Sequence, residues 1–210
     1  MINDFEQYIN CPLCEQEKNN IFYRSPYDSK EVKEFIHNYY KGRVDSEVLK
    51  ETILQINWCD NCDFYWHKYV LKPENLYELY NKWIDPEESR IKQEKKSIKE
   101  RMSIIQRIVR QLEAVNVTND QPKILDFGSG WGTWALCARA LGCDVYVAET
   151  SIERMKYAEK QGLKVIQDIE SIPDNFFDLM ILSQVLEHIP QPKQSLKQLL
   201  KFLHVGGGCR

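Results

Sequence analysis

The chain contains the stretch Ile124-Leu125-Asp126-Phe127-Gly128-Ser129-Gly130-Trp131-Gly132. Its apolar start favours a buried strand. Its three closely spaced glycines favour a tight turn, because glycine adopts positive φ without steric cost. Apolar residues at helical spacing follow from Thr133 onward, so the turn is expected to join a strand to a helix. Such a turn brings bare backbone close to a ligand at the carboxyl end of the strand.

From Lys123 onward, short apolar runs alternate with amphipathic ones, which is the pattern of parallel strands joined by crossover helices. The sequence therefore predicts a Rossmann-like, doubly wound parallel sheet of the α/β class over residues 117–210. The expected strands are 123–127, 144–149, 164–167 and 177–183, and the expected helices are 133–141, 152–161 and 194–204. Since Gly206-Gly207-Gly208 looks only like the approach to a fifth strand, we expect an incomplete sheet at the C-terminus. Strand 177–183 would then lie at an open edge, and two explanations stay open: the chain is a fragment, or a second copy or a partner covers this edge.

Two acidic residues accompany the glycine loop. Asp126 immediately precedes the turn, and Glu149 ends the next expected strand, where a carboxylate can accept hydrogen bonds from both hydroxyls of a ribose. Structural alternatives stay open, with Asp126 as a turn or cap residue and Glu149 as the cap of the helix that begins near Ser151. Gly132 comes one residue too early for the G-x-G-x-x-G pattern of dinucleotide-binding domains.

Together these features resemble motif I and the following acidic residue of class I S-adenosylmethionine-dependent methyltransferases, and the resemblance covers most of residues 121–208. It implies that the glycine loop faces the methionine part of the cofactor and that Glu149 holds its ribose. Asp168 and Ile169 follow the third expected strand, where the family places an acid for the adenine amino group and an apolar side chain against its face. The expected cofactor-binding residues are Asp126, Gly128, Ser129, Gly130, Trp131, Glu149, Asp168, Ile169 and Ser183.

Glu187 and His188 are the predicted catalytic residues. They follow the fourth expected strand, near the place where the cofactor's methyl group should point. Methyl transfer to a hydroxyl needs removal of a proton, and imidazole titrates near neutral pH. A packing role for both stays open. Gln184 and Val185 stand where resembling O- and C-methyltransferases carry a metal-binding glutamate and a catalytic tyrosine, so those mechanisms are not carried over.

Four of the seven cysteines form two C-x-x-C pairs, Cys11 with Cys14 and Cys59 with Cys62. Two such pairs provide the four soft ligands that a tetrahedral structural zinc site requires. A redox role for a single pair is the alternative, and His67 is an alternative ligand. Cys137 and Cys143 are expected to be small buried residues.

The cysteine pairs resemble the N-terminal zinc-binding region of some methyltransferases that modify sugars in antibiotic and surface-polysaccharide pathways. The resemblance implies a sugar or nucleotide-sugar acceptor, with the zinc module helping to cover it. Tyr65, Trp66 and Tyr69 lie close to the second pair. They could stack on a sugar or form the core of the module, and both interpretations stay open.

Three regions are predicted from these patterns. Residues 1–84, rich in Tyr and Trp, form a compact, loop-rich zinc-binding module. Residues 85–116 form one linking helix, which starts with a capping box of Asp85 and Glu88. Residues 117–210 form the cofactor-binding domain.

Charge and hydropathy narrow the classes of function. The net charge is −3 at pH 7, so no nucleic-acid partner is expected. No run approaches the roughly 20 apolar residues that cross a bilayer, and the N-terminus lacks the plan of a signal peptide. We therefore expect a cytoplasmic protein without a membrane span.

The sequence thus predicts S-adenosylmethionine-dependent methyl transfer to a small polar acceptor, in polysaccharide or secondary-metabolite biosynthesis if the acceptor is a sugar. Two other hypotheses stay open. One is a noncatalytic zinc-module protein that keeps the methyltransferase fold, and the other, less favoured, is an NAD-dependent oxidoreductase.

Overall fold

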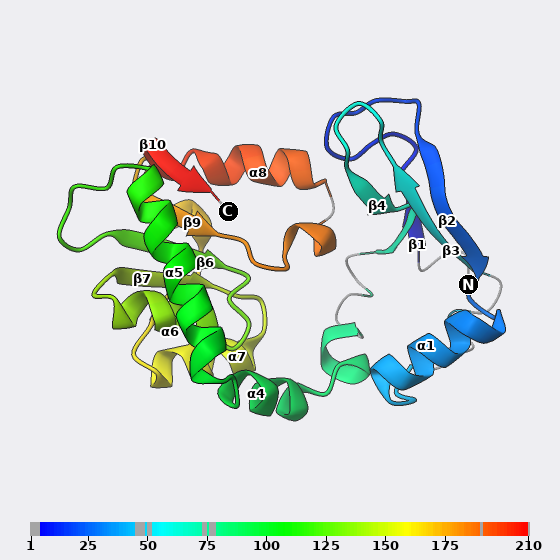
Figure 1. Cartoon of the computed structure of the whole chain (residues 1–210), viewed down its shortest axis with the longest axis horizontal. Helices are drawn as coiled ribbons and strands as arrows, with labels where there is room; N and C mark the ends of the chain where they lie inside the picture. The colour runs from blue at the N-terminus through cyan, green and yellow to red at the C-terminus, as the bar shows by residue number, and fades with distance from the viewer. Residues whose placement is uncertain are drawn as a thin grey trace. The chain divides into compact units, whose positions relative to one another are not determined.

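A computed structural model of the chain describes residues 5–44, 49, 52–72, 75, 79–189 and 191–209. The chain divides into two compact units (Figure 1). The first comprises Met1–Ser89 with Pro190–Lys193, and the second comprises Arg90–Ile189 with Gln194–Arg210. The division falls inside the predicted linking segment 85–116. Among the described residues, no helix combines the length and apolar character that a membrane span needs.

A five-stranded sheet forms the centre of the second unit, and every pairing in it is parallel. The order β10-β9-β6-β7-β8 places the first strand of the unit in the middle. The α/β prediction is therefore confirmed. The strands are β6 (Lys123–Phe127), β7 (Asp144–Ala148), β8 (Lys164–Val165), β9 (Phe177–Ile181) and β10 (Leu203–Cys209).

The prediction of four strands was wrong, because β10 pairs with β9 and removes β9 from the edge of the sheet. Leu203 pairs with Phe177, and the register then shifts before Gly208 pairs with Leu179. A Cβ on Gly208 would approach a methyl of Val115 to 2.8 Å. β10 therefore needs glycine at this position so that Val115 can pack close to its backbone. Because glycine is generally depleted in strands, the three glycines did not indicate a strand in the sequence.

Helices cover both faces of this sheet (Figure 1). One buried cluster joins α5 (Ile98–Ala114), α6 (Thr133–Ala140) and α7 (Ile152–Lys160) to the face that carries Ile124 and Leu179. The other joins α8 (Pro192–Leu200) to the face that carries Leu125 and Met180. Successive strand residues alternate between the clusters, as two covered faces require. The core therefore fixes the carboxyl ends of the strands, where the expected site lies.

The predicted single linking helix is in fact two helices, α4 (Pro86–Glu94) and α5. Ser97 starts α5 with a complete capping box: its hydroxyl accepts from the Glu100 N–H at 3.3 Å, and the Glu100 carboxylate accepts from the Ser97 N–H at 2.8 Å. The predicted cap of α4 is half formed. Asp85 accepts from the Glu88 N–H at 3.1 Å, whereas the Glu88 carboxylate pairs with Lys41. The helical spacing of apolar residues continues across the break between α4 and α5, so the sequence pattern did not indicate the break.

The first unit is more regular than the predicted loop-rich module. It contains the antiparallel sheet β2-β3-β4, the strand pair β1-β5, the helix α1 and a short π-helix. Their bounds are β1 (Phe5–Gln7), β2 (Asn20–Pro26), α1 (Lys30–Tyr40), β3 (Ile53–Trp58), β4 (Tyr65–His67), β5 (Tyr69–Leu71) and η2 (Leu79–Trp83). The alternation of β3 was not recognisable because its inward positions include the polar Gln55 and Asn57, which are 4% and 2% exposed.

Candidate functional site

The glycine loop joins β6 to α6, and three of its residues have positive φ: Gly128 at 68°, Gly130 at 57° and Gly132 at 72°. A Cβ on Gly128 would lie 2.6 Å from Cγ2 of Val185, so this position excludes any side chain. A Cβ on Gly130 would meet nothing within 4 Å. The loop is therefore packed against the segment after β9 at Gly128 and is open at Gly130.

Asp126, the acid before the turn, lies at the end of β6 and is 2% exposed. Its Oδ2 accepts a hydrogen bond from the Ala135 N–H at 3.1 Å, which ties the loop to the first turn of α6. Burial raises the pKa of Asp126 to about 7; the bond from Ala135 opposes this shift, and the nearby Glu149 carboxylate adds to it. Asp126 therefore accepts a hydrogen bond at the start of α6, as the alternative role of a turn or cap residue requires.

Glu149 follows β7 and touches the glycine loop directly. Its Oε2 accepts from the Gly130 N–H at 2.9 Å. Its Oε1 accepts from the backbone N–H groups of Thr150 at 2.8 Å and Ser151 at 3.1 Å, at the start of α7. The carboxylate therefore links the loop after the first strand to the helix after the second, and its side chain is only 7% exposed.

The buried hydroxyl of Ser129 has no hydrogen-bond partner among the described residues. An unpartnered buried polar atom is costly, and it is a feature that a bound ligand can satisfy. Together with the open space at Gly130 and the carboxylate of Glu149, it fits a loop that holds a polar cofactor. Trp131 is 5% exposed and packs edge-on against Tyr157, with ring centroids 5.3 Å apart.

The remaining predicted cofactor residues follow β8 and β9, at the same carboxyl edge of the sheet. Asp168 is exposed and caps the short helix η3 (Ile169–Ser171) by accepting from the Glu170 N–H at 3.0 Å. Ile169 packs against the cluster of Leu125, and Ser183 is half-buried just after β9.

Glu187 and His188 lie in the short helix η4 (Leu186–His188), and both are exposed. The neighbouring Val185 is buried against Gly128 of the loop. That contact ties the segment after β9 to the glycine loop. The two predicted catalytic residues are therefore solvent-accessible and lie two and three residues after Val185, which contacts the loop. Their chemical role stays a prediction.

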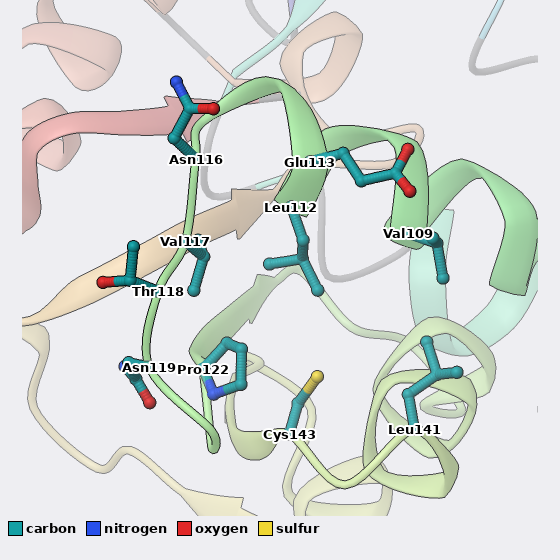
Figure 2. Close-up of a pocket in the computed structure, with 10 residues that line it drawn as sticks. All are labelled: Val109, Leu112, Glu113, Asn116, Val117, Thr118, Asn119, Pro122, Leu141 and Cys143. Carbon is teal, nitrogen blue, oxygen red and sulfur yellow. The ribbon is translucent and has the colours of Figure 1, made fainter.

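A pocket of about 520 Å³ lies at the opposite end of the strands (Figure 2). Pro122 precedes β6 and Cys143 precedes β7, whereas the glycine loop and Glu149 follow these strands. The pocket contains none of the predicted site residues. Its lining residues are Val109, Leu112, Glu113, Asn116, Val117, Thr118, Asn119, Pro122, Leu141 and Cys143.

The first unit brings the four paired cysteines together. All four Sγ atoms lie within 4.8 Å of one another, and the pairs Cys11–Cys62 and Cys14–Cys59 are each 3.6 Å apart. Zn–S bonds of about 2.3 Å in a tetrahedron place sulfurs about 3.8 Å apart, so the geometry fits a single zinc ion. A disulfide bond needs a sulfur–sulfur distance of about 2.05 Å, so sulfurs 3.6 Å apart are not joined by one. Hydrogen bonds from the Asn61 side chain and the Gln16 backbone lower the pKa of Cys14 to about 6.

The aromatic residues near the second pair have different positions. Trp66 is 6% exposed and packs with Cys11 and Cys59, so it belongs to the core of the module. Tyr65 is 47% exposed, and Tyr69 is half-buried. His67 lies on β4 outside the four-cysteine group.

Sequence reasoning missed Arg154, Tyr157 and the packing role of Val185. Arg154 and Tyr157 are three residues apart on α7, so they share one face of the helix. That spacing was visible in the sequence. The contact between Val185 and Gly128 depends on tertiary packing and left no local signal.

This chain has a parallel sheet with the Rossmann-like strand order, a glycine loop after the first strand and an acid after the second. This arrangement is typical of domains that bind nucleotide-containing cofactors. Residues 96–209, more than half of the chain, match the profile of a methyltransferase domain. The chain belongs to this methyltransferase-domain family.

Solved structures show distant similarity. An S-adenosylmethionine-dependent methyltransferase from Archaeoglobus fulgidus is 18% identical, with 50% of this chain aligned to 48% of that one and a TM-score of 0.39. YcgJ from Bacillus subtilis is 17% identical over 50% of this chain and 48% of its own, with a TM-score of 0.42. A protein from Methanococcus maripaludis is 17% identical over 59% and 61%, with a TM-score of 0.48.

The chain thus spans about half the length of the first two structures and 61% of the third. No curated protein matches the sequence.

Proposed function

We propose that the chain carries out S-adenosylmethionine-dependent methyl transfer to a small polar acceptor. The hydrogen bond between the Gly130 N–H and the Glu149 carboxylate carries this proposal, because it joins the two elements that would hold an adenosine ribose and an amino-acid tail. The match of residues 96–209 to a methyltransferase domain supports the choice of cofactor.

Each predicted residue has a distinct task in this proposal. Glu149 accepts hydrogen bonds from the ribose hydroxyls, and the backbone of Gly128, Ser129 and Gly130 lies along the methionine part. Asp126 keeps the loop in place through its bond to the start of α6. Asp168 and Ile169 contact the adenine, while Trp131 and Ser183 complete the walls. When bound, the cofactor supplies a methyl group that is already electrophilic.

The acceptor side rests on Glu187 and His188. We propose that the His188 imidazole takes a proton from the acceptor and that Glu187 orients it or the acceptor. Both side chains are exposed, so an acceptor can reach them from solvent. A sugar or nucleotide-sugar is the acceptor class that the resemblance to zinc-containing sugar methyltransferases favours.

His188→Ala separates this role from packing. We expect cofactor affinity to stay unchanged and the methylation rate of any acceptor found by screening to fall about 100-fold or more, the usual contribution of general acid–base catalysis. Radiolabel transfer from the methyl donor measures the rate. Equal rates for the variant and the parent would assign His188 to packing. Cofactor binding without any turnover would instead favour the noncatalytic hypothesis.

We also propose that Cys11, Cys14, Cys59 and Cys62 hold one structural zinc ion. The separations of their sulfurs support this, and a set of four thiolates leaves no open position for a reacting group. The ion supplies bonds that cross-link the turn after β1 to the turn between β3 and β4. Elemental analysis of the purified chain should give one zinc per chain.

The cofactor proposal is tested by calorimetric titration of the full chain with S-adenosylhomocysteine and, separately, with NAD. Micromolar binding of S-adenosylhomocysteine alone is the expected result. Preferential binding of NAD would favour the oxidoreductase hypothesis, and binding of neither would overturn the proposed function.

A further inference from the structure

Two side chains of α7 pack against Trp131 of the glycine loop. The Arg154 guanidinium carbon lies 5.7 Å from the centroid of the Trp131 ring, and the Tyr157 ring meets it edge-on at 5.3 Å. Arginine over an aromatic face is attracted by the ring quadrupole, and more strongly when water is excluded. Since Trp131 is 5% exposed, α7 holds this part of the loop from a largely dry side.

The same guanidinium reaches Glu149. Nη1 of Arg154 lies 3.7 Å from Oε2 of the carboxylate, and the two side chains are only 15% and 7% exposed. This separation is an ion pair rather than a hydrogen bond, and partial burial protects it from screening by salt. Arg154 therefore contacts both parts of the expected cofactor site: the loop after β6 and the acid after β7.

The hydrogen bonds of Glu149 differ between its two oxygens. Oε1 accepts from three donors, the Thr150 N–H at 2.8 Å, the Ser151 N–H at 3.1 Å and the Thr150 hydroxyl at 3.3 Å. Among the residues that the structure describes, the Gly130 N–H at 2.9 Å is the one hydrogen-bond donor to Oε2. Because each carboxylate oxygen offers about two lone pairs, Oε2 is the one with capacity for a ligand hydroxyl. It is also the oxygen that Arg154 faces.

We propose that Arg154 is a positioning residue of the cofactor site, which fixes Oε2 of Glu149 relative to the ring of Trp131 so that this oxygen can accept a hydrogen bond from a ribose hydroxyl. The inference rests on the proposed function and adds a residue to it. Without the guanidinium, Oε2 would keep the Gly130 N–H as its one contact among the described residues. Part of the free energy of cofactor binding would then be used to order the carboxylate and the loop, so the cofactor would bind more weakly.

The test is the affinity of the full chain for S-adenosylhomocysteine, measured by calorimetry on Arg154→Met and on Arg154→Gln. We expect binding to weaken about tenfold or more in both, with Arg154→Lys intermediate because it keeps the charge but not the planar stacking. Lys156→Met is the matched control, since it removes an exposed positive charge two residues away on the same helix. It should bind as the parent does. Thermal unfolding without ligand identifies any variant that fails to fold, and the glutamine variant then serves if the methionine variant fails.

A double variant distinguishes positioning through Glu149 from general damage. Glu149→Gln should itself weaken binding, and Arg154→Met combined with it should weaken binding little further, because both act on the same carboxylate. Fully additive losses, or an Arg154→Met variant that binds like the parent, would overturn the role of Arg154 while leaving the proposed function intact. A parent chain that binds no S-adenosylhomocysteine would overturn the proposed function, and this role with it.

Discussion

The two units keep their interiors together by different means. In the second unit, apolar side chains on both faces of the parallel sheet form two large buried clusters. In the first unit, the buried cluster at the cysteine group consists of Cys11, Cys59 and Trp66, and the buried side chains of β3 include Gln55 and Asn57. Small modules with little apolar core usually depend on a metal or on disulfides. We therefore expect the proposed zinc ion to take the place of a large apolar core in the first unit, whereas the apolar core holds the second unit together.

The largest expected effect comes from removing one sulfur of the cysteine group. Cys59→Ser should abolish stoichiometric zinc and unfold the turns around it, because binding free energy of about 10–16 kcal/mol is lost when a structural zinc site is broken. Metal analysis gives the zinc content. Hydrogen exchange should show lost protection in β3 and β4, with protection in β6 and β9 unchanged.

Cys209→Ser is the matched control, since Cys209 is an exposed thiol outside the cysteine group. It should keep one zinc per chain. A Cys59→Ser chain that retains full zinc and full protection would remove the distinction between the two units.

The opposite experiment addresses the apolar core. Leu179 is 1% exposed in the middle of β9, so Leu179→Ala should lower the free energy of unfolding of the second unit by about 2–5 kcal/mol and leave the zinc content unchanged. Chemical denaturation followed by hydrogen exchange measures this. Val205→Ala, at a position 99% exposed on β10, should change stability by less than about 0.5 kcal/mol. Loss of zinc in the leucine variant would mean that the two units depend on one core.

The same contrast explains how much of the fold was predictable. In the second unit, the observed β6 has the predicted bounds, and α6 and α7 each end one residue short of them. Apolar periodicity carries the signal there. In the first unit, Gln55 and Asn57 take the inward positions of β3, so the usual alternation is lost. They are satisfied by each other and by Asn19, at 2.8 Å and 2.7 Å, which only tertiary structure reveals.

The candidate site divides in a similar way. Spacing along the chain predicted the four cysteines, and the structure brings their sulfurs together. The glycine loop and Glu149 were predicted as separate elements, and the bond between Gly130 and Glu149 joins them. Arg154 was missed because its partners, Glu149 and Trp131, come from two different loops. A side chain that contacts two loops has no signature in either of them.

The two units should also differ in how their stability depends on pH, because the second unit contains the buried acid Asp126. Burial raises the pKa of Asp126 to about 7, above the ordinary value of 3.8, so the folded second unit holds a proton that the unfolded chain releases. The free energy of unfolding should therefore fall as pH rises from about 4 to 7, by about 1.4 kcal/mol per pH unit from this group. Asp85 has its pKa lowered, chiefly by the bond from the Glu88 N–H, so in the first unit stability is lost as pH falls below about 4.

Asp126→Asn keeps an oxygen for the Ala135 N–H but cannot ionise. Its unfolding free energy, measured by urea denaturation of the second unit at intervals between pH 4.5 and 6.5, should lack the decline seen in the parent. Asp120→Asn is the control, because Asp120 is exposed and its removal should leave the slope in place. If the slopes of the parent and Asp126→Asn coincide, Asp126 is charged in the folded chain across this range. The second unit would then hold a buried charge beside Glu149, and its core would tolerate ionic groups much as the first unit tolerates polar ones.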